Sequence, residues 1–388
     1  MRRLLSILIV LTIIISGFYI NAEKENVITF EKAKLELIKN NRTLKKLDYI
    51  QRKAQLQYNK AVIASKNIDI SGLKEELAKF FMKLDKYDEM LMIMQRDFFP
   101  KQMKYYWLSS YDNKIITEKS LIIGLRDLYL ALYNAKFDIN IKQEKLNLAK
   151  EKYNQDKTKY MQGLITENEL EEVNYSLQKA EKELIIAKRD LENITRSLNS
   201  YIGVPLNTTY DEVIFKENLR YMDLKPVEYY IEKALNERLE IKNLEKQIEL
   251  KELEKSILEK NDVHKIYTQA RKDHENVVRD IQNLNLKLEK AKYEIENEIK
   301  TAYIDIKKEV NNLNNLQRML QLQKRKLKAL KSQYYQGMIP KIYIKELEIS
   351  IKEMENSLKI IKYNYNTKML KLEYASGIGP AYGKVGVR

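Results

Sequence analysis

The chain has 388 residues, with 70 Lys or Arg against 55 Asp or Glu and a formal net charge of +15. It contains no cysteine, which excludes disulfides, thiol-linked lipid anchors, cysteine nucleophiles and cysteine-based metal sites. Only 10 glycines and 5 prolines occur, while 32% of the residues are charged, a composition typical of long helices.

The start of the chain, up to Ala22, has the layout of a secretory signal peptide. Arg2 and Arg3 precede an apolar run from Leu4 to Ile20, and the chain becomes polar after Ala22. We therefore predict a signal peptide over residues 1–22 and an exported chain. An uncleaved N-terminal anchor is the alternative, because the run is close to the lower limit of about 17 residues for a spanning helix. No comparable apolar stretch follows, so we expect no membrane-spanning helix in the mature chain.

The positive charge of the mature chain does not indicate nucleic-acid binding. The leader carries two of the positive charges, which leaves +13. No aromatic–basic module or nucleic-acid fingerprint accompanies that charge. After export it is better explained by a lysine-rich, solvated surface, so we expect no nucleic-acid partner.

The mature chain is an internal duplication. Residues 174 positions apart match in one register: Tyr129 with Tyr303, Tyr160 with Tyr334, Gln162 with Gln336, Gly163 with Gly337, Leu184 with Leu358 and Gly203 with Gly377. The starts of the repeats, at Asn40 and Glu237, are 197 positions apart. The difference between the two offsets, 197 and 174, places 23 extra residues in the middle of the first repeat, between about Ala61 and Leu125. We predict repeat 1 over residues 23–205, repeat 2 over 206–375 and a flexible tail over 376–388.

Both repeats carry coiled-coil seams, in which apolar residues recur at alternating spacings of three and four. In repeat 1 the seam after Gly163 is Leu170, Val173, Leu177, Ala180, Leu184, Ala187, Leu191, Ile194 and Leu198. The equivalent line in repeat 2 is Ile344, Leu347, Ile351, Met354, Leu358, Ile361, Tyr365 and Leu372. A further seam precedes Gly337: Leu313, Leu316, Leu320, Leu327, Leu330 and Tyr334. The predicted fold class is therefore mainly all-α, with long antiparallel hairpins and few or no strands.

Gly163 and Gly337 stand alone between two seams, which predicts the turns of two helical hairpins. Glycine suits the left-handed residue that commonly ends a helix. Thr166 and Pro340 then fit the start of the return helix, as a cap and a first-turn residue. Further apolar residues lie on the other faces, among them Tyr153, Tyr175 and Ile185. They favour hairpins that pack side by side in an oligomer, and a surface rich in tyrosine is the alternative.

These features are similar to the TolC-like outer-membrane efflux protein family. The resemblance covers nearly the whole mature chain and rests on four phrases: ITFEKAKLELIKNNRTLKKL from Ile28, the turns YMQGLITENEL and YYQGMIPKIYI, and LNSYIGVPL from Leu198. The resemblance implies a homotrimer that forms an α-helical tunnel in the cell envelope or periplasm, or at the outer membrane. It also implies a periplasmic adaptor (membrane fusion) protein and an inner-membrane transporter as partners in efflux or secretion.

The resemblance also implies roles for particular residues. The adaptor-contact turns map onto Gly163, Leu164, Ile165 and Thr166, and onto Gly337, Met338, Ile339 and Pro340. Pro340 departs from the Ser or Thr that is common there. The constriction candidates are Tyr343 and Glu346, with Glu169 and Glu172 at the matching positions of repeat 1. A solvated helix face is the alternative for each of these glutamates.

The resemblance breaks in the middle of each repeat, where the family contributes β-hairpins to an outer-membrane barrel. Residues 257–295 hold no alternating run of about 10 residues, the signature of a membrane strand. Only Met103–Leu121 could form a short β-hairpin, near Asp112–Asn113. Its Tyr105, Tyr106 and Trp107 resemble an interfacial membrane anchor. We predict a TolC-like protomer with a reduced or missing membrane barrel.

No residue pattern indicates an enzyme. His264 and His274 are the only histidines, and their spacing of ten does not place them on one helix face. We assign no catalytic residues, no metal site and no cofactor. The remaining alternative is an exported coiled-coil interaction protein, an adaptor or surface spacer without a channel; a tunnel requires a closed ring of hairpins, whereas a spacer does not.

Overall fold

The computed structural model describes residues 27–215 and 224–377. The predicted signal peptide, and all but the first two residues of the tail predicted over 376–388, lie outside these residues. In chain order the elements are β1 (Val27–Thr29), α2 (Phe30–Asn40), α3 (Arg42–Lys66), α4 (Ile70–Lys79), α5 (Lys86–Ile93), the π-helical turn η1 (Met94–Phe98), α6 (Phe99–Met161), α7 (Glu167–Ile202), β2 (Glu212–Ile214), α8 (Val227–Glu237), α9 (Leu239–Glu259), the 3₁₀ turn η2 (Lys260–Asp262), α10 (Val263–Ile266), α11 (Thr268–Tyr335) and α12 (Lys341–Ala375).

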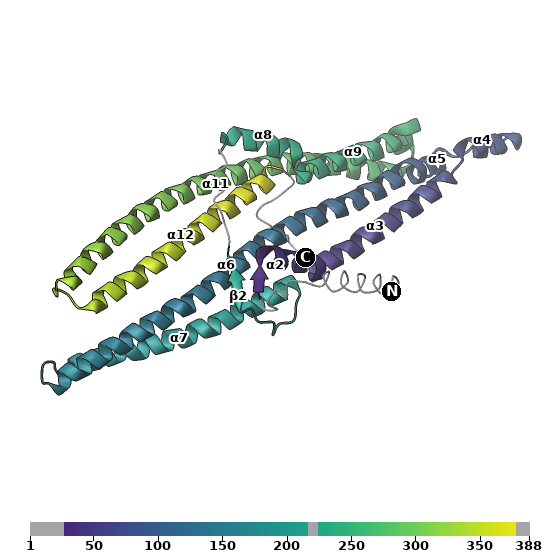
Figure 1. The fold of residues 1–388 in the computed structure, drawn as a ribbon. Helices are drawn as coiled ribbons and strands as arrows, with labels where there is room; N and C mark the ends of the chain where they lie inside the picture. The colour runs from purple at the N-terminus through teal and green to yellow at the C-terminus, as the bar shows by residue number, and fades with distance from the viewer. Residues whose placement is uncertain (1–26, 216–223, 378–388) are drawn as a thin grey trace, which may run out of the picture. The chain divides into compact units, whose positions relative to one another are not determined.

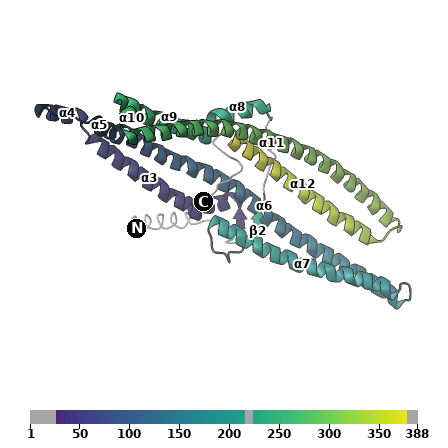
Figure 2. The same ribbon diagram turned by 180° about the vertical axis from the view of Figure 1, so that it is seen from behind.

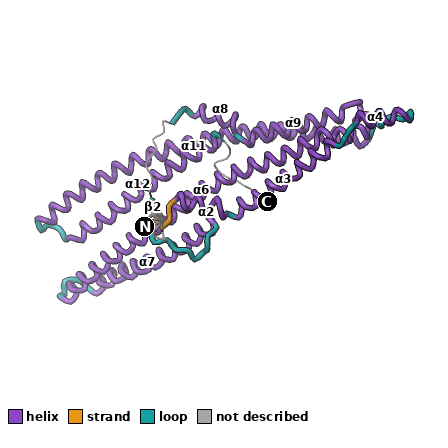
Figure 3. The backbone as a smooth tube through the Cα atoms, turned by 45° about the vertical axis from the view of Figure 1, so that its right-hand side comes forward, coloured by secondary structure: helices purple, strands orange, loops and turns teal. Residues whose placement is uncertain are grey.

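The fold is mainly α-helical and confirms the predicted class. Within residues 27–215 and 224–377 the strands β1 and β2 have three residues each, and Figure 3 shows loops confined to short connections between long helices. In the same ranges, no helix combines the length and the apolar character needed to cross a bilayer.

The β-hairpin considered for Met103–Leu121 does not form. The whole segment lies inside α6, a single helix of 63 residues. Ser110 bonds back to the carbonyl of Trp107 at 2.6 Å, and Lys114 pairs with Asp48 of α3 at 2.5 Å. The helix therefore continues through Asp112–Asn113, because neighbouring side chains pack against the segment and override its weak turn signal.

The duplication is visible in the helix boundaries. Helices α6 and α11 end at Met161 and Tyr335, and α7 and α12 begin at Glu167 and Lys341. Both pairs have the same offset as Gly163 and Gly337. Helices α3 and α9 begin at Arg42 and Leu239, with the same offset as the starts of the two repeats. The repeats are therefore matched element by element.

The extra residues of the first repeat build α4 and α5. Met94 of η1 precedes Thr268, the start of α11, by the offset that relates the two hairpin turns, so the repeats return to a common register there. Between α3 and η1 the first repeat inserts two helices, whereas the second repeat has only the short η2 and α10 between α9 and α11. This insertion has no helical counterpart of its size in the second repeat.

The chain divides into two compact units. Unit 1 contains the residues up to Lys39 together with Asp127–Lys216, and unit 2 contains Asn40–Arg126 and the residues from Glu217 onward. The boundary lies within α6, so the units do not coincide with the two sequence repeats. Each unit holds one hairpin: α7 with the second part of α6 in unit 1, and α11 with α12 in unit 2 (Figures 1 and 2).

Unit 1 contains a small parallel sheet. Strand β1 pairs with β2 in the register Ile28 with Val213. The hydroxyl of the buried Tyr129 lies 2.6 Å from the carbonyl of Ile214 and 3.1 Å from that of Ile28. Burial raises the pKa of Tyr129 above its ordinary value, so the neutral hydroxyl is retained as the donor. One side chain of α6 thus ties both strands to the helix.

Asn199, in the segment LNSYIGVPL, has a structural role in the loop that follows α7. It is fully buried, and its amide nitrogen donates to the carbonyls of Leu206 at 3.2 Å and Thr208 at 2.7 Å. Its side-chain oxygen accepts from the hydroxyl of Tyr210 at 2.7 Å. Burial raises the pKa of Tyr210 to about 12. One asparagine side chain therefore provides hydrogen-bond partners for the loop that leads from α7 to β2.

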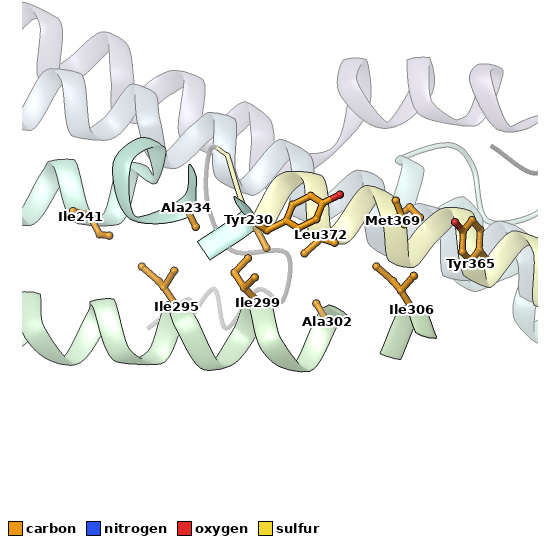
Figure 4. Packing of buried hydrophobic residues seen from close by; sticks show 11 residues of the cluster. Tyr230, Ala234, Ile241, Ile295, Ile299, Ala302, Ile306, Tyr365, Met369 and Leu372 are labelled. Atoms are coloured by element: carbon orange, nitrogen blue, oxygen red, sulfur yellow. The ribbon is translucent and has the colours of Figure 1, made fainter. Parts of the chain in front are cut away.

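Unit 2 has two apolar clusters. The first joins α8, α9, α11 and the end of α12 (Figure 4): Tyr230, Ala234, Ile241, Ile295, Ile299, Ala302, Ile306, Tyr365, Met369, Leu372 and Ala375. The second joins the far end of α9 to α4, α5, η1, α10 and the start of α11: Ile70, Met90, Ile93, Phe98, Ile257, Leu258, Val263, Ala270, Val277 and Ile281. The two clusters fix α11 at its middle and at its first turns, and the hairpin extends beyond them toward Gly337.

Candidate functional site: the two hairpin turns

The two hairpin turns have the same backbone geometry. Gly163 and Gly337 adopt the left-handed conformation, with φ of 70° and 75°. In the first turn the amides of Gly163 and Leu164 donate to the carbonyls of Tyr160 and Lys159, each at 2.9 Å. In the second turn Gly337 and Met338 donate to Tyr334 at 2.9 Å and Gln333 at 3.0 Å. Both helices therefore end in a Schellman motif. This motif supplies hydrogen-bond donors to carbonyls of the last helical turn and requires a left-handed residue.

The return helices begin differently. Thr166 is the N-cap of α7, and it forms a reciprocal capping box with Glu169. Pro340 occupies the N-cap position of α12, one residue before the predicted first-turn position, and provides no side-chain cap. Proline has no amide hydrogen, and its φ of −66° is compatible with the start of a helix. The start of α12 therefore relies on the backbone conformation of proline, whereas the start of α7 uses side-chain hydrogen bonds.

The turns present apolar side chains to solvent. Leu164 is 68% exposed and Met338 is 69% exposed. A Cβ atom added at Gly163 or Gly337 would meet nothing within 4 Å. Ile165 and Ile339 are half-buried, while Thr166 and Pro340 are exposed. Each turn is thus a small apolar protrusion with open space around its glycine.

The constriction candidates lie in different environments. Tyr343 is 53% exposed, and Glu346 is half-buried on the next turn of α12. Glu172 is exposed on α7. Glu169 has a structural role, because its carboxylate accepts from the amide of Thr166 at 2.7 Å and from the Thr166 hydroxyl at 2.9 Å. These bonds, the backbone one first, lower the pKa of Glu169.

We predict that Thr166→Ala releases the first turn of α7. The cap and the capping-box partner are then lost together, so amide exchange of the segment 166–172 should accelerate, while exchange at the second turn stays unchanged.

In the wild type the same protection of the segment 166–172 against amide exchange should be lost on acidification. Because the folded pKa of Glu169 is lowered, its stabilisation is present above the ordinary glutamate pKa of about 4.3 and disappears as pH falls through the folded value. Hydrogen exchange with mass spectrometry measures both effects; equal acceleration at the two turns would contradict the capping role.

The predicted membrane-anchor aromatics do not form one exposed patch. The Trp107 ring stacks on Tyr58 of α3, with centroids 5.5 Å apart and planes 14° apart. The Tyr105 hydroxyl accepts from the side-chain amide of Gln247 of α9 at 2.5 Å, and burial raises the pKa of Tyr105. Tyr106 is the exposed member of the three. Two of the candidates therefore pack inside unit 2, which their sequence spacing did not reveal.

The two histidines are closer than their spacing suggested. The break between α10 and α11 folds His264 onto His274, with ring centroids 4.6 Å apart. His274 Nε2 lies 2.8 Å from Glu259 Oε1, and this contact is the largest cause of the lowered pKa of Glu259. In residues 27–215 and 224–377, no group of three or more His, Cys, Asp or Glu has the arrangement of a metal site.

The hairpins keep apolar side chains on faces other than their seams. The seam residues of α7 and α12 are buried or half-buried. By contrast, Tyr175 and Ile185 of α7 and Leu322 of α11 are more than half exposed. Tyr153 is half-buried. A single chain therefore leaves large apolar side chains exposed on both hairpins.

No family model and no curated protein matches the chain by sequence, but solved structures match its fold. A membrane protein from Pseudomonas aeruginosa gives a TM-score of 0.66 at 12% identity, over 92% of both chains. The outer membrane protein VceC of Vibrio cholerae gives 0.64 at 11% identity, over 90% of this chain and 96% of VceC. The CmeC outer membrane channel of Campylobacter jejuni gives 0.63 at 16% identity, over 90% and 85%. The chain therefore has the fold of the TolC-like outer-membrane channels.

Proposed function

We propose that the chain is a protomer of an oligomeric envelope conduit for efflux or secretion, working with an adaptor protein and an inner-membrane pump. The observation that carries the proposal is the pair of matched hairpins, each ending in the same left-handed glycine turn. These hairpins belong to a fold shared over about 90% of the chain with outer-membrane channels. A conduit of this kind needs no catalytic centre, because the pump supplies the energy.

The exposed faces of the hairpins support assembly into a ring. Helix α7 has 36 residues and α12 has 35, so each arm is about 50 Å long at 1.5 Å per residue. Over that length each arm buries one stripe in its own hairpin and leaves residues such as Tyr175 and Leu322 exposed. These exposed side chains are available to pack against a neighbouring protein surface. Neighbouring copies are the natural cover, and the predicted copy number is three.

Two sets of residues have proposed roles in this conduit. The turns around Leu164 and Met338 would contact the adaptor, since they are apolar, exposed and placed at the hairpin ends. Tyr343 and Glu346 would face the lumen at its narrow end, where three copies would form a ring of tyrosines and a ring of carboxylates. Glu169 is the weakest of the constriction candidates, because its carboxylate is held by Thr166.

The test is the mass of residues 23–388 in solution, measured by light scattering with and without detergent. A trimer supports the proposal, and a monomer or dimer under both conditions would favour the coiled-coil spacer. Channel recordings then test the lumen. Glu346→Lys combined with Tyr343→Ala should shift ion selectivity toward anions, because it replaces a ring of carboxylates by ammonium groups. Glu192→Lys, at an exposed position of α7 remote from the hairpin turn, is the matched control, and unchanged selectivity in the double variant would remove Tyr343 and Glu346 from the constriction.

A further inference from the structure

The insertion in the first repeat ends in an unusual helix terminus. Helix α4 closes with Phe81 in the left-handed conformation, at φ 57°. The amides of Phe81 and Met82 donate to the carbonyls of Ala78 at 3.1 Å and Leu77 at 3.0 Å. This is the same Schellman pattern as at Gly163 and Gly337, with phenylalanine in the position of the glycine. A bulky residue in that conformation is strained, so a glycine would suit the local fold better.

The strained residue is also the most exposed apolar side chain of the turn. Phe81 is 100% exposed, and its neighbours Phe80 and Met82 are 70% and 60% exposed. We call Phe80, Phe81 and Met82 the apolar tip. Three consecutive bulky apolar residues facing solvent are rare on a soluble surface and mark a site of interaction. Backbone strain retained at such a position points in the same direction.

The rest of the insertion holds the tip away from the core of unit 2. Of the ten residues of α4, only Ile70 is buried, and it packs in the second apolar cluster. Lys74 of α4 pairs with the mostly buried Glu89 of α5 at 2.7 Å. Asp85 is the N-cap of α5, and its carboxylate accepts from the hydroxyl of Tyr267 at 2.6 Å. The base of the insertion is therefore anchored, and the helix projects beyond it (Figures 1 and 3).

Within unit 2 the apolar tip and the Gly337 turn lie toward opposite ends of α11. The insertion packs against the first turns of α11, through Ala270 and Val277, whereas Gly337 follows the last turn. Helix α11 has 68 residues, which corresponds to about 100 Å. A partner of the apolar tip is therefore distinct from a partner of the hairpin turn.

The chemistry of the tip favours a lipid bilayer as its partner. Exposed lysines stand directly on both sides of it, Lys79 and Lys83, in the sequence KFFMK. Glu75 and Glu76 lie about one turn further back on α4. The tip lies at the end of α4 with all three side chains exposed, so they are placed to enter an apolar phase. Aromatic and methionine side chains can enter the acyl boundary while adjacent lysines extend to anionic headgroups.

We propose that Phe80, Phe81 and Met82 insert into the surface of a lipid bilayer and dock the first repeat on a membrane, with Lys79 and Lys83 at the headgroups. The docking does not depend on channel activity, so it is distinguishable from the conduit itself. It also differs from the anchor predicted at Tyr105–Trp107, two members of which are packed inside unit 2.

The test uses the absence of cysteine in the natural chain. Met82→Cys and, as a matched control, Met338→Cys are introduced separately into the full chain and labelled with an environment-sensitive fluorophore. With vesicles of phosphatidylcholine and phosphatidylglycerol, we expect a blue shift and quenching by spin-labelled lipid at position 82 and neither at position 338. No change at position 82, or equal changes at both positions, would overturn the proposal. A blue shift at position 82 that requires protein concentration but no vesicles would instead assign the tip to a second copy of the chain.

A second variant separates binding from folding. Phe81→Gly relieves the left-handed strain, so thermal unfolding should be unchanged or shifted upward. Its affinity for the vesicles should fall about tenfold, the effect expected for losing one buried aromatic side chain. Lys79→Gln with Lys83→Gln should weaken binding to the anionic vesicles and leave binding to pure phosphatidylcholine nearly unchanged. Wild-type affinity in Phe81→Gly would exclude membrane insertion of the tip.

Discussion

Replacing Arg238 by methionine is expected to lower the stability of unit 2 by about 3 kcal/mol, since removing one partner of a buried ion pair leaves the other uncompensated. Arg238 is 2% exposed and lies between α8 and α9. Its guanidinium contacts Glu298 of α11 at 2.6 Å and Glu240 of α9 at 2.5 Å. It also lies 3.5 Å from the carbonyl of Ala375 at the end of α12. One side chain thus ties α9, α11 and α12 together.

The expected loss of stability lies at the lower end of the range for breaking a buried ion pair, because Glu240 and Glu298 keep some contact with water. Urea unfolding followed by circular dichroism measures the loss. Arg196→Met is the control: its ion pair with Glu192 is exposed on both sides, so its effect should stay below about 0.5 kcal/mol. Combining Arg238→Met with Glu298→Leu should recover part of the loss, because the carboxylate that lost its guanidinium contact is then removed. Equal stability of Arg238→Met and wild type would mean that packing alone holds the three helices.

Placing a carboxylate on both hairpin turns, as Leu164→Glu with Met338→Glu, is expected to reduce transport by the assembled conduit at least tenfold. Both side chains are exposed, so the folded chain has no contact to lose. An apolar interface with an adaptor would instead have to bury two charges per protomer, which is strongly unfavourable without partners. The measurement is efflux or secretion by cells, together with the oligomer recovered from the same cells.

The matched control for this variant is Gln162→Glu with Gln336→Glu, which adds the same charges one residue before each glycine at positions that are already polar. This control should keep transport and oligomer. If the glutamate pair at Leu164 and Met338 lost the oligomer as well as transport, the turns would be structural elements and not a docking surface.

The turns and seams could be predicted from the sequence because the information is local. A glycine isolated between two three-four patterns has few explanations other than a left-handed helix end, and Gly163 and Gly337 adopt that conformation. The two offsets found between the repeats in the sequence reappear in the helix boundaries, because both copies of a duplicated sequence carry the same local signals. The mainly α-helical class followed from the same patterns.

The errors arose where a side chain's partner is distant in the sequence. Met103–Leu121 has aromatic residues and an Asp–Asn pair that fit a hairpin, but Trp107 stacks on Tyr58 and Tyr105 bonds to Gln247. Helix packing therefore decided its conformation. His264 and His274 were judged by helix periodicity, yet the break at α10 brings their rings together. The apolar tip was missed because KFFMK resembles any buried helix segment until its exposure is known.

By itself, the sequence determined the helical class, the duplication, the position of both turns and the family resemblance, since each depends on periodicity or on spacing along one chain. Only the tertiary structure decided which apolar residues are covered. It packed Trp107 against Tyr58, left Phe81 fully exposed and assigned Glu169 to a capping box. Burial depends on which helices meet, and this is fixed by packing between segments that are distant in the sequence.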